Sequence, residues 1–257
     1  MKVYVINLKR ESDRFKHIDS IFKSFKIDYE IFFAIDYKNF SNSFYHNFLK
    51  DRPLFIPSKP AAACYLSHYN LWKKIANGID EYATIFEDDV HISSSFKEFC
   101  SLQKLLPKYF DVIRLETSTN RLHLSKKPVF KLSDRGIFNL YSTSWGAGGY
   151  ILSKVGAKKI LSYPLKEHRH ADSTLFSYER SIIAKQLVKF QVNPAVCVQD
   201  KFFNNNKNIK LPSIIRKTSD TSWEKSKFYK LYTTLKFSKL SILKKIIYNY
   251  QRINYIN

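Results

Sequence analysis

The N-terminal segment contains two apolar runs separated by an amphipathic stretch. Residues 3–6 are apolar at consecutive positions, as in a strand of a parallel sheet that is buried on both faces. From about Ser12, apolar residues recur at spacings of three and four, which predicts a helix; they are Phe15, Ile18, Phe22 and Phe25. A second β-rich run covers residues 29–35. The pattern therefore predicts a βαβ unit at the start of the chain.

The same alternation continues toward residue 198. After a polar and aromatic segment at 37–59, which we expect to be an irregular loop, Pro60 begins a helix that ends at Gly78. Strands are also predicted at 83–86, 111–115 and 190–198, helices at 94–106, 154–162 (capped by Ser153) and 173–187, and an antiparallel pair at 128–141. This order is typical of an α/β fold whose mixed, mostly parallel sheet has helices on both faces.

Composition places the chain among globular proteins. With 44% hydrophobic and 16% aromatic residues, 257 residues suffice for a large core, which excludes wholesale disorder. The sequence contains no apolar run of 18 residues, and its first residues lack a signal-peptide cleavage site. The three cysteines are widely spaced, which predicts reduced thiols in a cytoplasmic protein; they are Cys64, Cys100 and Cys197.

Positive charge is concentrated at the C-terminal end. The chain carries 43 Lys+Arg against 22 Asp+Glu, a net charge of +21. Residues 207–257 hold twelve basic and two acidic residues, a net +10, whereas residues 1–206 hold 31 and 20, a net +11. Such a balance implies an anionic partner. We predict a domain of residues 1–206 followed by a basic tail of residues 207–257.

The tail has the pattern of one amphipathic helix from Trp223 to Tyr250. The apolar side comprises Phe228, Leu231, Tyr232, Leu235, Ile242, Leu243, Ile246 and Tyr250, and Lys227, Lys230, Lys244 and Lys245 lie opposite. Lys225, Lys236 and Lys239 fall near the apolar stripe, where long stems snorkel. This pattern favours an in-plane anchor on an anionic membrane. A helix packed on the domain or docked on a partner is the alternative.

An acidic triplet, Glu87-Asp88-Asp89, directly follows the predicted strand 83–86. Ligands of open α/β sheets bind outside the carboxyl ends of the strands. On an extended backbone Glu87 and Asp89 share a face and Asp88 points away. Two converging carboxylates need a cation between them, and Mg²⁺ or Mn²⁺ shared with substrate phosphates fits that need. The alternative is a solvated strand end whose charges meet nearby lysines.

Five collinear blocks resemble a known enzyme family. They are Val5-Ile6-Asn7-Leu8-Lys9-Arg10 with Asp13-Arg14; Phe33-Ala34-Ile35-Asp36; Ala63-Cys64-Tyr65-Leu66-Ser67-His68 with Trp72; Phe86-Glu87-Asp88-Asp89; and Gly148-Gly149-Tyr150-Ile151-Leu152-Ser153 with Gly156-Ala157. Over roughly residues 2–200 they resemble glycosyltransferase family 25, the lipooligosaccharide glycosyltransferases of Gram-negative bacteria. The sequence departs from the family pattern at Tyr37 and at residues 61–63, where the family has Gly, and at His170-Ala171-Asp172, which replaces Pro-x-Asp.

The resemblance implies a GT-A fold that binds a UDP-sugar with Mn²⁺ or Mg²⁺ at a DxD-type motif. The acidic triplet would be that motif, with Asp89 binding the metal, Glu87 as its partner, and Glu87 or Asp88 contacting the ribose or the donor sugar. Bacterial members transfer galactose from UDP-galactose with inversion. The implied acceptor is a lipooligosaccharide, and the implied location is the cytoplasmic face of the inner membrane.

An inverting transfer also needs a carboxylate base near the acceptor hydroxyl. Asp172 is the first candidate, from the family match, and Glu116, after the apolar run 112–115, is the second. A surface carboxylate paired with Lys or Arg is the alternative for each.

Further candidates flank the predicted strand ends. Donor-binding candidates, besides Glu87 and Asp88, are Asn7, Arg10, Arg14, Asp36, Ser67 and His68. Acceptor-binding candidates are Trp145, Gly148, Gly149 and Tyr150. The alternatives are helix-surface charge for the arginines, a turn cap for Asp36, a core histidine at His68, and core packing for the two aromatic residues.

The sequence is also compatible with other donors and with two other functions. The donor is alternatively UDP-glucose or a UDP-N-acetylhexosamine. A nucleic-acid-binding protein would explain the charge, but the sequence contains no recognised nucleic-acid-binding motif, so we expect no nucleic-acid partner. A metal phosphohydrolase would use the same acidic triplet.

Overall fold

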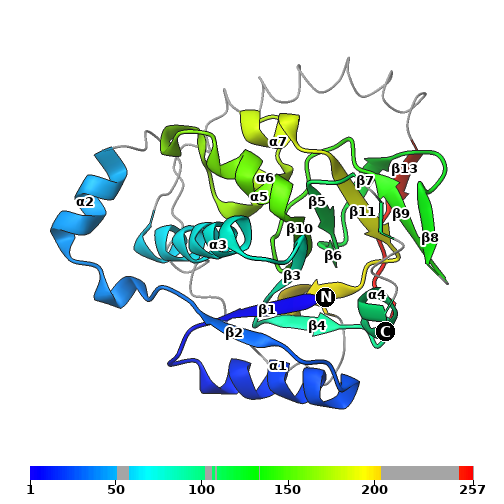
Figure 1. Cartoon of the computed structure of the whole chain (residues 1–257), viewed down its shortest axis with the longest axis horizontal. Coiled ribbons are helices and arrows are strands. Elements are labelled where there is room, and N and C mark those ends of the chain that lie inside the picture. Colours follow the sequence, from blue (N-terminus) through cyan, green and yellow to red (C-terminus); the bar gives the residue numbers. More distant parts are fainter. Residues whose placement is uncertain (51–57, 102–105, 108, 133, 204–248, 257) are drawn as a thin grey trace.

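The central feature of the fold is an eight-stranded sheet with the order β2-β1-β3-β10-β5-β11-β9-β8. The computed structural model, shown in Figure 1, describes residues 1–50, 58–101, 106, 107, 109–132, 134–203 and 249–256. β1 pairs in parallel with β2 and β3, and β5 with β11, whereas β10 and β9 run antiparallel to their neighbours. Six of the eight strands therefore point the same way, which confirms a mixed α/β fold with a mostly parallel sheet.

The first three strands place their carboxyl ends together. They are β1 (Lys2–Asn7), β2 (Glu30–Phe33) and β3 (Tyr82–Glu87). Ile6 of β1 lies opposite Phe32 of β2 and Glu87 of β3, so all three strands end at one edge. Tyr4 and Ile6 pack into one apolar cluster, and the alternating residues of β1 pack into the other. The strand is thus buried on both faces, as its sequence predicts.

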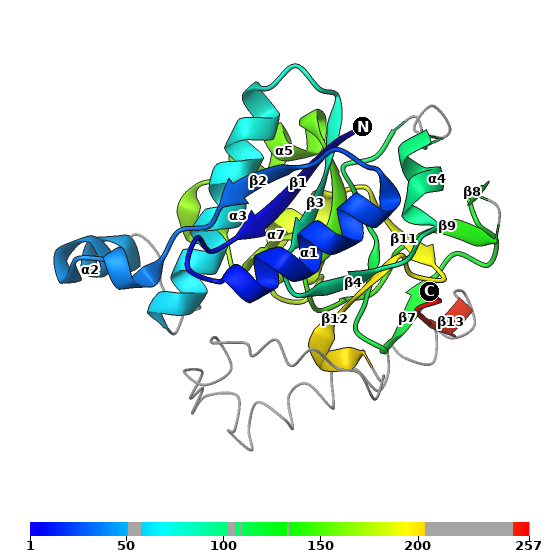
Figure 2. The same ribbon diagram turned by 90° about the horizontal axis from the view of Figure 1, so that it is seen from below.

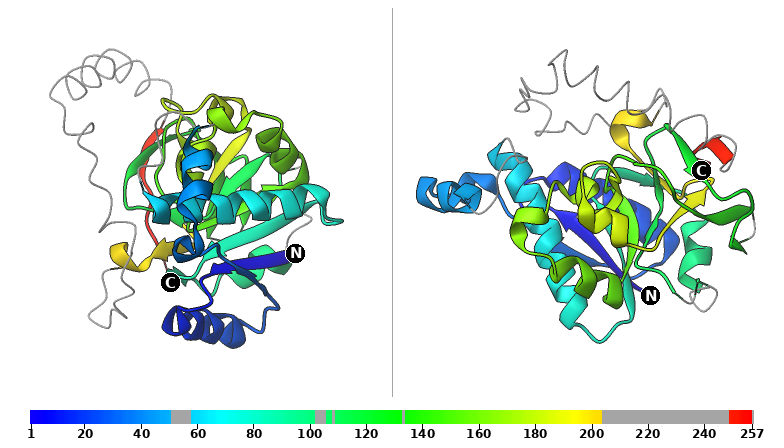
Figure 3. Two further views of the ribbon diagram at one scale, coloured as in Figure 1. Left: turned by 90° about the vertical axis from the view of Figure 1, so that its left-hand side faces the viewer. Right: turned by 90° about the horizontal axis from the view of Figure 1, so that it is seen from above.

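Helices cover both faces of the sheet (Figures 1 and 3). One face carries α3 (Lys59–Asn77), α5 (Lys154–Leu161), α6 (Ala171–Phe176) and α7 (Ile182–Gln186), and the other carries α1 (Ser12–Phe25) and α4 (Phe96–Ser101). The Ser58 side chain accepts a hydrogen bond from the Ala61 amide at the start of α3, and Gly78 ends that helix. Ser153 caps α5 in the same way, by accepting from the Gly156 amide.

A second, three-stranded sheet borders the carboxyl edge. The remaining strands of the large sheet are β10 (Gly149–Ser153), β5 (Val112–Arg114), β11 (Lys189–Asn193), β9 (Arg135–Asn139) and β8 (Phe130–Leu132), and the second sheet contains β4 (Val90–Ile92), β12 (Cys197–Gln199) and β6 (Glu116–Thr117). β4 follows β3 after two residues, and β6 follows β5 after one. The second sheet therefore starts where β3 and β5 end.

The end of the chain returns to the domain. β13 (Asn249–Arg252) pairs antiparallel with β7 (Arg121–Leu124), Ile253 is buried, and Ala195 bridges to Tyr255. The helix predicted to continue to Tyr250 is therefore wrong at its end, because inter-strand hydrogen bonds with β7 give residue 250 an extended conformation. The rest of that predicted helix, residues 223–248, lies outside the described residues. Among the described residues, no helix is long and apolar enough to cross a bilayer.

Most of the other predicted elements are confirmed, and three more are corrected. The segment 37–59, expected to be irregular, contains a 3₁₀ turn at Tyr37–Asn39 and the helix α2 (Asn42–Lys50), which projects from the body (Figure 2). Aromatic rings spaced four residues apart, at Phe40, Phe44 and Phe48, pack on one another along this segment. The sequence itself shows this spacing of four residues, which is typical of a helix.

The other two corrections concern single elements that the structure divides. The helix predicted over 173–187 is two helices, because α6 ends at Phe176 and the side chain of Ser181 caps α7. The strand predicted over 190–198 is likewise two strands, β11 and β12, with Pro194, which has no amide hydrogen to donate, between them. Within the helix predicted over 94–106, the structure contains α4 (Phe96–Ser101), and residues 102–105 lie outside the described residues.

Candidate functional site

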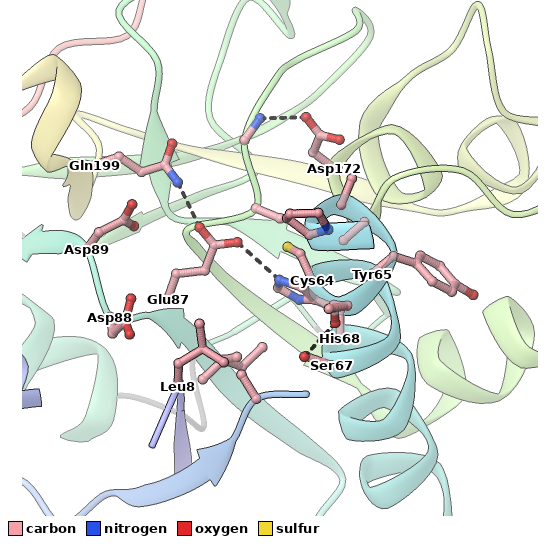
Figure 4. A pocket seen from close by; sticks show the side chains of 18 of the residues that line it. Leu8, Cys64, Tyr65, Ser67, His68, Glu87, Asp88, Asp89, Asp172 and Gln199 are labelled. Atoms are coloured by element: carbon pink, nitrogen blue, oxygen red, sulfur yellow. Dashed lines mark hydrogen bonds and ion pairs between the residues drawn. The ribbon is translucent and has the colours of Figure 1, made fainter. Parts of the chain in front are cut away.

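A pocket of about 370 Å³ opens at the carboxyl edge of β1 and β3 (Figure 4). Its walls come from the ends of these strands, the first turn of α1, the first half of α3, the loop before β10 and the segment after β12. Lining residues include Leu8, Arg14, Cys64, Ser67, His68, Glu87, Asp88, Asp89, Trp145, Asp172, Gln199 and Lys201. Open α/β sheets bind ligands at this position.

Asp88 is held by the first βα unit. Its Oδ2 accepts a hydrogen bond of 2.8 Å from Asn7, and its Oδ1 accepts one of 2.7 Å from Arg14. Arg14 also lies 3.7 Å from an oxygen of Asp89. The prediction that Asn7 and Arg14 lie at the same edge as the acidic triplet is confirmed. Asp88 turns toward α1, yet it too lines the pocket.

Glu87 is fixed by residues distant in sequence. Its Oε1 lies 3.1 Å from Nε2 of His68, and its Oε2 accepts a hydrogen bond of 2.7 Å from Gln199. Burial by itself would raise the pKa of Glu87, but the hydrogen bond from the His68 ring, together with the positive charge of Lys201 and the hydrogen bond from Gln199, leaves that pKa below its ordinary value of 4.5. Glu87 is therefore an ionised carboxylate with both oxygens occupied.

Asp89 differs from its two neighbours in having an oxygen to spare. Its Oδ1 is buried without a hydrogen-bond partner among the described residues. Burial raises the pKa of Asp89, and the charge of Glu87 raises it further, while Arg14 opposes both effects. A cation beside Oδ1 would relieve this penalty.

A hard divalent cation fits Asp89 best. Carboxylate oxygens are the ligands that Mg²⁺ and Mn²⁺ prefer. A second group of side chains, Cys64, His68 and Glu87, offers three ligand atoms within 4.8 Å of one another. There, however, both His68 nitrogens and both Glu87 oxygens are already hydrogen-bonded, and burial raises the pKa of the Cys64 thiol. Glu87, the other predicted ligand, is thus less available than Asp89.

The turn between Trp145 and Gly149 is fixed by charged side chains. Arg114 donates to the Trp145 carbonyl over 2.5 Å, Asp172 accepts from the Gly146 amide over 3.2 Å, and Glu116 accepts from the Gly148 amide over 2.7 Å. Gly146 has φ +93°, and a Cβ there would lie 2.4 Å from Glu116 Oε1. The turn therefore needs glycine both for its backbone conformation and for its contact with Glu116.

The two base candidates occupy different positions. Asp172, in the first turn of α6, lines the pocket, and its other oxygen accepts from the Ser173 amide. Glu116 is fully buried behind the turn and does not line the pocket, so the prediction of Glu116 as a base near the acceptor is not supported. Burial raises the pKa of Glu116 to about 7, with the charge of Glu87 adding to it and Arg114 opposing it.

The remaining donor candidates have structural roles. Arg10 forms an ion pair with Asp36, whose Oδ1 accepts from the Lys38 amide and so caps the 3₁₀ turn. Asp36 does not line the pocket, and Arg10 does. The Ser67 hydroxyl donates to the Ala63 carbonyl and accepts from the Ile35 amide, which fastens α3 to the loop after β2.

The acceptor candidates separate into one exposed ring and three buried residues. Trp145 is 39% exposed at the pocket wall, with Arg180 over its ring. Tyr150 is fully buried and does not line the pocket, which favours core packing, the alternative stated for it, over contact with an acceptor sugar. Gly148 and Gly149 face protein, not ligand: a Cβ on Gly149 would lie 2.2 Å from Sγ of Cys197.

Sequence reasoning missed Gln199, at the end of β12, and Lys201, in the turn that follows; both line the pocket. No motif marks them. The one available signal was their position after the predicted strand 190–198, since residues that follow parallel strands gather at this edge. Lys201 is an exposed cation whose charge lowers the pKa of Glu87.

Comparison with known proteins finds similarity to glycosyltransferases and lipooligosaccharide biosynthesis proteins. Residues 1–175 match the family model "Glycosyltransferase family 25 (LPS biosynthesis protein)". The chain is 30% identical over 241 residues to the lipooligosaccharide biosynthesis protein lex-1 of Haemophilus influenzae, covering 80% of this chain and 78% of that protein. It is 27% identical over 223 residues to the lacto-N-neotetraose biosynthesis glycosyltransferase LgtE of Neisseria meningitidis, with coverages of 80% and 78%. Procollagen galactosyltransferase 1-A of Xenopus laevis is 28% identical over 222 residues, covering 75% of this chain and 35% of its own.

Glu116 makes stability depend on pH. Its pKa of about 7 in the folded protein exceeds its ordinary value of 4.5, so the folded state holds a proton that the unfolded state releases between these values. The free energy of unfolding therefore falls as pH rises through this window. Relative to Glu116→Gln, we expect the wild type to lose about 2–3 kcal/mol between pH 5 and pH 8.

Urea unfolding at four pH values measures this difference. Asp13→Asn, on the exposed side of α1, controls for the removal of one negative charge. Parallel pH curves for the wild type and Glu116→Gln would contradict the assignment.

Proposed function

The chain belongs to glycosyltransferase family 25, and from this premise we propose that it is a metal-dependent, inverting glycosyltransferase of the GT-A fold. The donor is UDP-galactose, and the acceptor is a lipooligosaccharide oligosaccharide. The observation that carries this proposal is the pocket at the carboxyl edge of β1 and β3, where Asp89 keeps a buried oxygen unpartnered among the described residues. Charged groups of both signs and one exposed indole line the same pocket.

The reaction exchanges one bond at the anomeric carbon. The acceptor oxygen attacks this carbon as its bond to the nucleoside diphosphate breaks, and the diphosphate leaves with the electron pair. The acceptor hydroxyl loses its proton to a carboxylate base, for which we propose Asp172. Asp172 lines the pocket, and its hydrogen bonds from the Gly146 and Ser173 amides hold the side chain in place.

The other pocket residues orient the two substrates. Glu87, held on both oxygens, faces the donor as an acceptor of hydrogen bonds from ribose or sugar hydroxyls, and Lys201 adds a positive charge near the diphosphate. Trp145 offers an exposed ring for stacking on an acceptor sugar. Mn²⁺ or Mg²⁺, when bound by Asp89 and the donor phosphates, supplies charge neutralisation for the leaving group.

Galactose as the transferred sugar is supported by sequence similarity. The name of the Xenopus relative specifies galactosyl transfer, and the names of two bacterial relatives specify lipooligosaccharide and lacto-N-neotetraose biosynthesis. UDP-glucose and UDP-N-acetylhexosamines are the alternative donors.

Calorimetric titration with UDP-galactose, UDP-glucose and UDP-N-acetylglucosamine, each with Mn²⁺ and with EDTA, tests the donor and the metal. We expect UDP-galactose to bind tightest, and at least about tenfold more weakly in EDTA because the diphosphate loses its counter-charge. Asp89→Asn should remove the Mn²⁺ dependence, since an amide oxygen carries no net charge.

Asp19→Asn is the matched control. Asp19 lies on α1, accepts a hydrogen bond from the Tyr29 hydroxyl and does not line the pocket. The proposal fails if no UDP-sugar shows metal-dependent binding to the wild type.

Asp172→Asn tests the base. The variant keeps a carbonyl oxygen that can accept one of the two backbone hydrogen bonds, but its amide cannot take up the acceptor proton. We expect kcat to fall by about 10²–10⁴ while the dissociation constant of the donor stays within about twofold. Near-normal turnover would show that another group is the base.

We also propose that the basic tail holds the enzyme on the cytoplasmic face of the inner membrane, where a lipid-linked acceptor lies. The support is compositional: residues 207–257 carry a net +10, and near an anionic leaflet each lysine contributes about 1 kcal/mol. The proposed division is a catalytic domain of residues 1–206 followed by this tail. Residues 249–256 are nevertheless anchored on the domain through β13.

Vesicle co-sedimentation tests the tail. Changing Lys227, Lys230, Lys244 and Lys245 to Glu should weaken binding to vesicles rich in phosphatidylglycerol by about 100-fold or more. Changing four exposed lysines of the domain to Glu gives the same net charge and should weaken it far less; they are Lys126, Lys127, Lys131 and Lys166. Equal losses for the two variants would show that total charge, not the tail, governs membrane binding.

A further inference from the structure

Four side chains form a hydrogen-bonded chain from the core to the pocket. Trp72 Nε1 donates to Tyr150 Oη over 2.8 Å, Tyr150 Oη lies 2.8 Å from His68 Nδ1, and His68 Nε2 lies 3.1 Å from Glu87 Oε1. Trp72, Tyr150 and His68 are fully buried, whereas 21% of the Glu87 side chain is exposed. Trp72 and Tyr150 do not line the pocket, so they act on a ligand only through the other two residues.

The chemistry of these groups fixes the direction of each proton. An indole nitrogen only donates, so the Tyr150 oxygen accepts from Trp72. The Tyr150 hydroxyl hydrogen then has Nδ1 of His68 as its acceptor. A nitrogen that accepts a hydrogen bond carries no proton, so the ring proton of His68 is on Nε2. That N–H donates to Glu87, which as a carboxylate only accepts.

The opposite arrangement leaves a buried hydroxyl unsatisfied. If Nδ1 of His68 carried a proton, in the neutral or the charged ring, the Tyr150 oxygen would accept from both Trp72 and His68. The Tyr150 hydroxyl hydrogen would then meet no other acceptor in the part of the chain that the structure describes. An unpaired buried polar group disfavours this arrangement by about tenfold or more.

We propose that Trp72 and Tyr150 are positioning residues for the donor site, which keep His68 as the neutral Nε2–H tautomer so that it holds Glu87 oriented toward the donor. The proposal rests on the glycosyl transfer proposed above for the identity of the ligand. It also removes His68 from consideration as the base, because its pocket-facing nitrogen carries a proton.

The orientation of Glu87 is defined from two sides. The Nε2–H of His68 holds one oxygen, and the amide of Gln199 holds the other. With both oxygens fixed, the remaining lone pairs of the carboxylate point in set directions, as selective recognition of a ribose or sugar hydroxyl requires. Loss of the Tyr150 hydroxyl frees the His68 ring to change tautomer and thereby loosens one of the two supports.

Nitrogen-15 NMR of histidine-labelled protein tests the tautomer without any ligand. The two ring nitrogens of a neutral histidine have widely separated shifts, and the signals of His68 are assigned by their absence in His68→Gln. We expect the wild type at pH 7.5 to show protonated Nε2 and unprotonated Nδ1, and Tyr150→Phe to show a mixture. A wild-type ring protonated on Nδ1 would overturn the proposal whether or not any variant folds.

Donor binding and turnover test the consequence. Tyr150→Phe should weaken UDP-galactose binding in Mn²⁺ by about tenfold and leave the acceptor KM within about twofold. Tyr29→Phe is the control, because its hydroxyl donates to Asp19 and neither residue lines the pocket; it should change neither quantity. A Tyr150→Phe enzyme with unchanged donor affinity, or with donor affinity and acceptor KM equally impaired, would overturn the positioning role.

The two measurements separate this proposal from the proposed function. If the wild type binds no UDP-sugar, the proposed function fails and the tautomer result still stands. If the wild type binds UDP-galactose but His68 is protonated on Nδ1, the proposed function stands and this inference fails.

Discussion

The constraint on which the site depends is the burial of three consecutive carboxylates at the end of β3. Like charges taken out of water repel strongly unless each has a partner. Asp88 accepts hydrogen bonds from Arg14 and Asn7. Glu87 is hydrogen-bonded to His68 and Gln199. These partners come from α1, β1, α3 and β12, so the packing of four elements converges on this strand end. Within the triplet, only Asp89 keeps an oxygen without a partner among the described residues, so it is the carboxylate with a position left for a ligand.

What the sequence predicted well was local or followed from parallel topology. Apolar runs located β1 and β3, Pro60 and Gly78 bounded α3, and Ser153 marked the start of α5. The proximity of Asn7 and Asp88 could also be predicted, because the carboxyl ends of neighbouring parallel strands lie at the same edge of the sheet. Each of these inferences needs only backbone periodicity, a cap or the direction of a strand.

What the sequence did not predict depends on long-range packing. Glu87 and Gln199 are 112 residues apart, and nothing in either neighbourhood indicates the other. From the sequence, a buried tyrosine such as Tyr150 cannot be distinguished from an exposed one that stacks on a sugar. Only the assembled fold shows that its hydroxyl contacts His68. Glu116 follows a strand as Asp89 does, yet the turn at Gly146 covers it. Burial decides function in these cases, and burial is a property of the assembled fold.

Arg14 has a consequence for how the protein folds. By contacting Asp88 at 2.7 Å and Asp89 at 3.7 Å, it provides an internal counter-ion at the place where an external cation would bind. Metal sites without such a residue often need the ion in order to fold. Here Arg14 already offsets part of the repulsion within the acidic triplet, so we expect the domain to fold without a bound cation. A folded domain with no ligand at this strand end is the consequence of that internal ion pair.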